Sequence, residues 1–156
     1  LQPLNSLLSV SFGEQNKKMT GANLAMRHNL KAAVTGNYPH LAIDPARVLI
    51  SQGSLRNAIS PVAASVLSGK LVFCWGDHGG TLRAMPSDIA IVAAYCAAQN
   101  EWIYQITDTA RKAGVCVLNV DAFRGKFVET YISFKSVVPV VRIADSVYTG
   151  MVRVLG

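Results

Sequence analysis

The chain has 156 residues and a mass of 16.7 kDa, with 15 Lys+Arg against 9 Asp+Glu, 51% hydrophobic residues and a mean hydropathy of +0.29. Charged residues are only 15% of the chain, which excludes a disordered, coiled-coil or acidic-tail protein and predicts a folded, unusually apolar one. The uncharged run at residues 89–98 is about half the length of a membrane-spanning helix, which needs roughly 20 residues, so we expect no membrane insertion.

The first 40 residues are predicted to be helical. Apolar residues from Leu4 to Phe12 follow helical spacing, so a short helix is expected over residues 3–12, with proline in its first turn. Thr20 is predicted to cap a second helix that ends at Gly36. Residues 37–40 are interpreted as a linker, because Pro39 disfavours helix in the residue before it. The apolar face of the second helix is predicted to consist of Ala22, Met26, Leu30 and Ala33.

From residue 47 onward the spacing of apolar residues changes to a period of two. Runs bounded by turn residues predict seven strands, at 47–51, 70–75, 88–96, 101–107, 114–120, 127–134 and 146–155. The run at 88–96 is apolar on both faces, which indicates a central strand covered on both sides or, alternatively, a buried helix. Seven short strands favour a mainly β fold, a seven-stranded antiparallel sandwich preceded by two short helices. The predicted domains are therefore a helical segment, 1–40, and a β-sandwich, 41–156.

Alternation along the strand at 70–75 predicts Leu71, Phe73 and Trp75 on one face. The three cysteines, Cys74, Cys96 and Cys116, form no closely spaced pair and leave one unpaired. This argues against a disulfide framework or a thiolate zinc site. All three lie in apolar runs and are expected to be buried free thiols.

Six blocks in order are MTGANLAMRHNLKAAVTGNYP, VLISQGSL, LVFCWGDHGG, SDIAIVAAYC, FVETYISFKS and SVYTGMVRV. They resemble an uncharacterised family, chiefly from Bacteroidetes, known only as a domain of unknown function. The resemblance covers residues 4–154 and implies a helical front part and a C-terminal sandwich similar to fibronectin type III and immunoglobulin domains. It implies no activity and no catalytic residues. Trp75 and Tyr131 resemble the core tryptophan and tyrosine of a fibronectin type III sandwich, and Leu1 is expected to be a truncated start.

The loop at residues 75–80, W-G-D-H-G-G, holds the one adjacent Asp and His pair, Asp77 and His78. A hydrolytic site would need a nucleophile and an orienting acid around His78, and no nucleophile motif accompanies it. A metal site that adds Asp88 would need ligands from separate loops. A glycine-rich turn explains the same residues, so we expect no enzyme, no metal and no cofactor.

Trp102 and Tyr104 alternate along one face of a predicted strand and could form an aromatic platform that stacks on sugars or bases. The same spacing also fits residues that pack against a sheet. Basic residues are mostly scattered rather than clustered, which disfavours nucleic acid as the partner.

Three classes of function remain. We favour a non-catalytic structural or assembly protein, because low charge density is typical of a chain that buries apolar surface against partners. It would self-associate through sandwich edges and the apolar segment 135–144, which departs from the resembled family. The alternatives are a binding module for carbohydrate or nucleic acid, with Trp102, Tyr104, Asp77 and His78 as binding residues, and an enzyme at Asp77 and His78. The predicted assembly residues are Val137, Val138, Pro139, Val140, Val147 and Tyr148.

Overall fold

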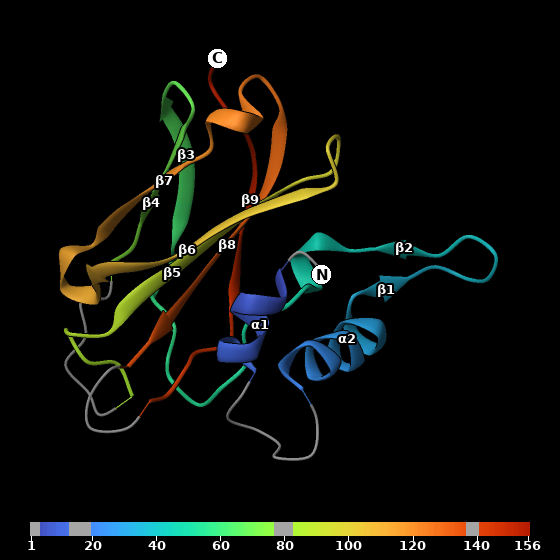
Figure 1. Ribbon diagram of the computed structural model, residues 1–156, viewed down its shortest axis with the longest axis horizontal. Coiled ribbons are helices and arrows are strands. Elements are labelled where there is room, and N and C mark those ends of the chain that lie inside the picture. The colour runs from blue at the N-terminus through green and yellow to red at the C-terminus, as the bar shows by residue number, and fades with distance from the viewer. Residues whose placement is uncertain (1–3, 13–19, 77–82, 137–140) are drawn as a thin grey trace.

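The computed structural model describes residues 4–12, 20–76, 83–136 and 141–156. The fold is mainly β, with two N-terminal helices followed by antiparallel sheets arranged as a sandwich (Figure 1). One sheet has the strand order β3 (Val62–Leu67), β4 (Lys70–Cys74), β7 (Val115–Asn119). The other has the order β6 (Glu101–Ala110), β5 (Ile89–Cys96), β8 (Phe127–Lys135), β9 (Val147–Arg153). The predicted fold class is confirmed.

The N-terminal part consists of α1 (Asn5–Ser11), α2 (Gly21–Ala32) and a small hairpin of β1 (Val34–Thr35) and β2 (Ala42–Ile43). The hairpin projects away from the sandwich (Figure 1). A 3-10 turn, η2 (Pro45–Arg47), follows it, and two more, η3 (Arg111–Ala113) and η4 (Asp121–Phe123), lie within the sandwich. The division of the chain at residue 40 stays a prediction.

Two expectations for α2 are wrong, namely where the helix ends and that Met26 and Leu30 lie on its buried face, whereas Ala33 is buried as predicted. The helix begins as predicted, since the Thr20 hydroxyl accepts a hydrogen bond from the Asn23 amide, but it ends at Ala32. Gly36, with φ of +88°, lies between the two strands of the hairpin instead of closing the helix.

The buried face of α2 is made by small residues rather than by its large apolar ones. Gly21, Ala25 and Asn29 are buried, whereas Met26 and Leu30 are 45% and 62% exposed. Gly21 lies so close to α1 that a Cβ placed on it would overlap the carbonyl of Leu8. Close approach of two helices requires small side chains at the contact, and this turns the large ones outward.

The predicted strand at residues 47–51 is absent, and β3 takes its place as the seventh strand of the sandwich. Val48 and Ile50 are buried, but the backbone around them is held by side chains instead of by a neighbouring strand. The Leu49 amide donates to Asn29 Oδ1 at 2.8 Å, and the Ile50 amide donates to Ser146 Oγ at 3.0 Å. The alternating burial of residues 48–50 therefore does not come from a strand in a sheet.

Two apolar clusters hold the fold together. The first lies between the two sheets and includes Phe73, Trp75 and Phe134. The second lies between the outer face of the four-stranded sheet and the N-terminal part, and contains Leu7 and Leu8 of α1. β5 contributes to both, which confirms the predicted central strand covered on both faces. Tyr131 belongs to the second cluster, so its expected place in the sandwich core is wrong.

The three cysteines differ in exposure. Cys96 and Cys116 are buried free thiols as predicted, and burial raises the pKa of the Cys116 thiol. Cys74 is exposed, because alternation along β4 turns it away from the core while Phe73 points inward.

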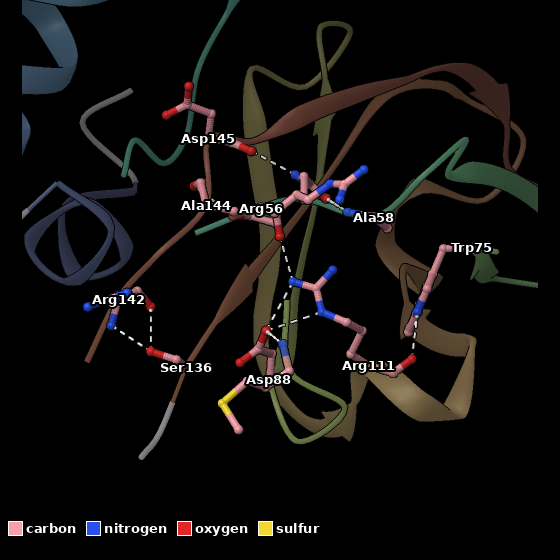
Figure 2. Close-up of polar contacts among 12 residues, drawn as sticks. Arg56, Ala58, Trp75, Asp88, Arg111, Ser136, Arg142, Ala144 and Asp145 are labelled. Carbon is pink, nitrogen blue, oxygen red and sulfur yellow. Dashed lines mark hydrogen bonds and ion pairs between the residues drawn. The ribbon is translucent and has the colours of Figure 1, made fainter. Parts of the chain in front are cut away.

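An ion pair lies inside the sandwich (Figure 2). The Arg111 side chain is fully buried and donates to Asp88 Oδ2 from Nε at 3.2 Å and from Nη2 at 3.1 Å. Nη2 also donates to the Arg56 carbonyl at 2.6 Å, and the guanidinium lies 4.2 Å from the centre of the Phe134 ring. Trp75 Nε1 donates to the Arg111 carbonyl at 2.8 Å. The pair therefore joins the ends of both sheets to the loop at residue 56.

Candidate functional site

The outer face of the four-stranded sheet, which is turned away from the other sheet, carries four aromatic rings in a row. Trp102 lies opposite Tyr95 in the β5–β6 register, and Tyr148 lies opposite Tyr131 in the β8–β9 register. The ring centres are 4.9 Å apart for Tyr95 and Trp102, 5.7 Å for Trp102 and Tyr131, and 5.4 Å for Tyr131 and Tyr148. These spacings are typical of interacting aromatic pairs. We call these four residues the aromatic row.

Tyr104 occupies the same face of β6 as Trp102 but has a different environment. It lies opposite Ala93 and packs, half-buried, against the second apolar cluster. Trp102 lines a cleft, whereas Tyr104 is not among the residues that line it. Of the two residues of the predicted platform, Trp102 lines the cleft with Tyr95 beside it, and the platform itself stays a prediction.

The cleft has a volume of about 730 Å³ and lies between the N-terminal part and one end of the aromatic row. One wall comes from α2, the hairpin and the segment after it, and includes the exposed residues Met26 and Leu30. The opposite wall comes from β5, β6 and β8. The described lining residues are Met26, Asn29, Leu30, Ala33, Val34, Ile43, Pro45, Val48, Tyr95, Ala97, Asn100, Trp102 and Glu129.

Glu129 is the one charged side chain among the described residues that line the cleft. The Tyr148 hydroxyl donates a short hydrogen bond to its Oε2. Burial raises the pKa of Tyr148, and the hydrogen bond and negative charge of Glu129 raise it further. Burial likewise raises the pKa of Tyr131, with Glu129 as the next cause. Both tyrosines therefore stay neutral beside the carboxylate at physiological pH.

The Asn29 amide is engaged at both its nitrogen and its oxygen, and the Asn100 amide at its oxygen. Asn29 Nδ2 donates to the Leu49 carbonyl at 2.9 Å, and Asn29 Oδ1 accepts from the Leu49 amide. Asn100 Oδ1 accepts from the Tyr95 hydroxyl at 2.9 Å. The cleft is thus apolar and aromatic, with one carboxylate on its wall.

Sequence reasoning missed Tyr95 and Glu129 as partners of Trp102. A short turn at residues 97–100 joins β5 to β6, with the Asn100 amide donating to the Ala97 carbonyl. The length of such a turn sets which residues face each other across a hairpin, so the pairing of Tyr95 with Trp102 could have been predicted. Glu129 is opposite Tyr95 on the other side of β5, which only the full strand order reveals.

Some of the remaining predicted residues lie outside the described part of the chain, and the others have structural partners. Asp77, His78, Val137, Val138, Pro139 and Val140 lie outside the described residues. Val147 is half-buried against the inter-sheet cluster, and Tyr148 belongs to the aromatic row. Asp88, considered above as a metal ligand, forms the ion pair with Arg111. Within the described ranges, no three His, Cys, Asp or Glu side chains gather as metal ligands do.

The segment 135–144 is anchored at both described ends. Ser136 and Arg142 exchange hydrogen bonds (Figure 2). The Ala144 amide donates to the Phe134 carbonyl. Ile143 and Ala144 are buried in the core. Only Val141, among its described apolar residues, is exposed.

A second unusual surface is the outer face of the three-stranded sheet. Two rows of paired residues cross it: Val62 beside Cys74 beside Val115, and Ala64 beside Val72 beside Val117. Val62 is 58% exposed, Val115 45% and Val117 46%. None of the six side chains is charged, although polar side chains usually cover the solvent face of an antiparallel sheet. We call these six residues the outer valine face.

Comparison with models of protein families identifies the family of this chain. A family model described as "Family of unknown function (DUF6266)" matches residues 1–150. The chain belongs to DUF6266. No curated protein and no solved structure matches it. Within the described residues of the chain, neither α1 nor α2 has the length and apolar character that crossing a bilayer requires.

Proposed function

We propose that this DUF6266 protein is a non-catalytic assembly protein that associates with further copies of itself. The single observation that carries the proposal is the outer valine face, a sheet surface with apolar side chains toward solvent. Contiguous exposed apolar surface marks protein contacts. The six residues themselves carry no charge, and Lys70 lies at one end of the same face of β4, so two copies can meet on the valines without direct like-charge contact in a two-fold symmetric interface.

The sandwich edges and the segment 135–144 are further proposed contacts. β9 is an edge strand of the four-stranded sheet, and Met151 within it is 61% exposed. An edge strand can add a strand from another copy by backbone hydrogen bonding. The outer valine face and the β9 edge belong to different sheets, so a chain could use both in one assembly.

The finer parts of the family resemblance also stay proposals. A fibronectin type III or immunoglobulin relationship is supported by the division into three and four antiparallel strands and by Trp75 in the inter-sheet cluster. A bacterial origin in Bacteroidetes rests on the sequence blocks alone.

Light scattering against protein concentration, followed by electron microscopy of larger species, tests the assembly. We expect multimers of the unmodified chain, and we expect Val62→Lys and Val117→Lys to reduce them to monomers. Val10→Lys, at an exposed position of α1, is the matched control and should leave the mass unchanged. A wild-type protein that stays monomeric at high concentration at both low and moderate salt would refute assembly. If wild type assembles and both face variants assemble equally, the outer valine face is the wrong surface.

A binding module is the second candidate, and the cleft beside Trp102 favours it. The sequence-based alternative was carbohydrate or nucleic acid. Glu129 on the cleft wall would repel phosphate, which counts against nucleic acid. Titration with a glycan panel and an oligonucleotide panel, read by tryptophan fluorescence, tests these two ligands.

A further inference from the structure

We propose that the cleft beside Trp102 binds an organic cation, an alkylated ammonium group carried on an apolar body. The inference rests on the second candidate function, a binding role for the cleft, and it names the ligand class. It is independent of the outer valine face, which lies on the other sheet.

The charge of the lining gives the first argument. The chain as a whole carries a net charge of +6, yet the one charge among the described lining residues is the carboxylate of Glu129. The hydrogen bond from Tyr148 holds Oε2 in place, and no described residue donates to Oε1. A carboxylate that is half-buried on an apolar wall attracts a cation more strongly than one in water. Because the net charge repels cations at a distance, recognition must depend on this local contact.

The aromatic rings give the second argument. Tyr95 and Trp102 lie side by side at 4.9 Å, with an angle of 37° between their planes. Both line the cleft on the same wall as Glu129, which is opposite Tyr95 in the β5–β8 register. The faces of such rings attract alkylated ammonium groups, and tryptophan does so best.

The apolar and polar content of the cleft decides between an organic cation and a sugar. Met26, Leu30 and Ile43 supply hydrocarbon surface on the opposite wall. A sugar needs several hydrogen-bond partners for its hydroxyls, whereas in this lining both ends of the Asn29 amide and Oδ1 of Asn100 already bond within the protein. An alkylated ammonium needs only a counter-charge, ring faces and apolar surface. The volume of about 730 Å³ lies within the range of small-molecule sites.

Isothermal titration calorimetry with matched probes tests the proposal. The probes are choline, its uncharged analogue 3,3-dimethylbutan-1-ol, phenyltrimethylammonium and methyl glucoside. We expect both cations to bind, and choline to bind about tenfold more tightly than the uncharged alcohol, which is the size of a partly desolvated cation–π contact together with a counter-charge.

Three variants identify the groups responsible. Glu129→Gln keeps an acceptor for the Tyr148 hydroxyl and should remove the preference for choline over the alcohol. Trp102→Leu keeps apolar surface but removes the ring face. It should lower the affinity for both cations about fivefold or more and leave the affinity for the alcohol unchanged. Glu101→Gln, an exposed glutamate next to Trp102 in sequence and outside the described lining, is the matched control and should bind like wild type.

The outcomes separate the ligand class from the binding role. Equal binding of choline and the alcohol, or an undiminished preference in Glu129→Gln, would overturn the inference. Binding of methyl glucoside without either cation would overturn it while leaving the binding module standing. No heat from any probe, with a cooperative thermal transition showing that the protein is folded, would count against both.

Discussion

Replacement of Arg111 by methionine removes the cation from the buried ion pair while keeping an apolar side chain of similar length. In the wild-type chain the guanidinium contacts Asp88 Oδ2 through two nitrogens, at 3.1 and 3.2 Å, and donates to the Arg56 carbonyl at 2.6 Å. In Arg111→Met, the Asp88 carboxylate, which is 1% exposed, loses both guanidinium nitrogens and keeps the hydrogen bond from the Met85 amide at 2.9 Å. Removing one partner of a buried pair leaves an uncompensated charge in the core.

The expected loss in the free energy of unfolding is about 3–5 kcal/mol. A chain of this size has a total stability of about 5–15 kcal/mol, so the variant stays folded only if the wild type is in the upper part of that range. At about 2–4 °C per kcal/mol, the midpoint of thermal unfolding should fall by roughly 6–20 °C.

Urea unfolding of wild type, Arg111→Met, Asp88→Asn and the double variant measures the coupling between the two side chains. The double variant should be more stable than the sum of the two single losses predicts, by at least about 1 kcal/mol, because it leaves no unpaired charge. A loss below about 1 kcal/mol, or a double variant that is no more stable than the two single losses together predict, would show that packing rather than charge sets the role of Arg111.

Two further predictions concern single aromatic residues. Trp75→Ala should cost roughly 3–5 kcal/mol in urea unfolding, since Trp75 is 5% exposed and packs edge-on against Phe134; a near-neutral result would contradict its core position. Burial raises the pKa of Tyr131 above its ordinary value of 10.0, so the folded state holds the proton more tightly than the unfolded state does. Stability should therefore be constant below about pH 9 and fall above pH 10 by up to about 1.4 kcal/mol per pH unit, and Tyr131→Phe should fall less steeply in alkaline urea titrations. Equal slopes in the two proteins would refute this account of Tyr131.

Features set by neighbouring residues could be predicted from the sequence. The hydroxyl of Thr20 caps α2 through a contact three residues away, and the continuous apolar run of β5 requires cover on both faces wherever it lies. Alternation in β4 assigned Phe73 and Trp75 to the core for the same local reason.

Features that depend on distant parts of the chain could not be predicted in this way. Residues 47–51 alternate like a strand, but Asn29 and Ser146 satisfy their backbone from 20 and 96 residues away. The large apolar residues of α2 match a core-facing stripe, yet the Gly21 contact with α1 decides which face is buried. The cleft depends on both effects, because turning Met26 and Leu30 outward supplies one of its walls.

The two proposed surfaces occupy opposite outer faces of one sandwich, and this placement explains why the chain is so apolar. A sandwich alone needs one buried face per sheet, and the inter-sheet cluster supplies it for both. The four-stranded sheet gains a second covered face from α1 and the segment at 48–50, which leaves the cleft at the uncovered end of the aromatic row. Within the described residues no segment covers the outer valine face of the three-stranded sheet, where Val62, Val115 and Val117 are 58%, 45% and 46% exposed. The same physical requirement, cover for an apolar sheet face, is met within the chain on one side, and a second copy would meet it on the other.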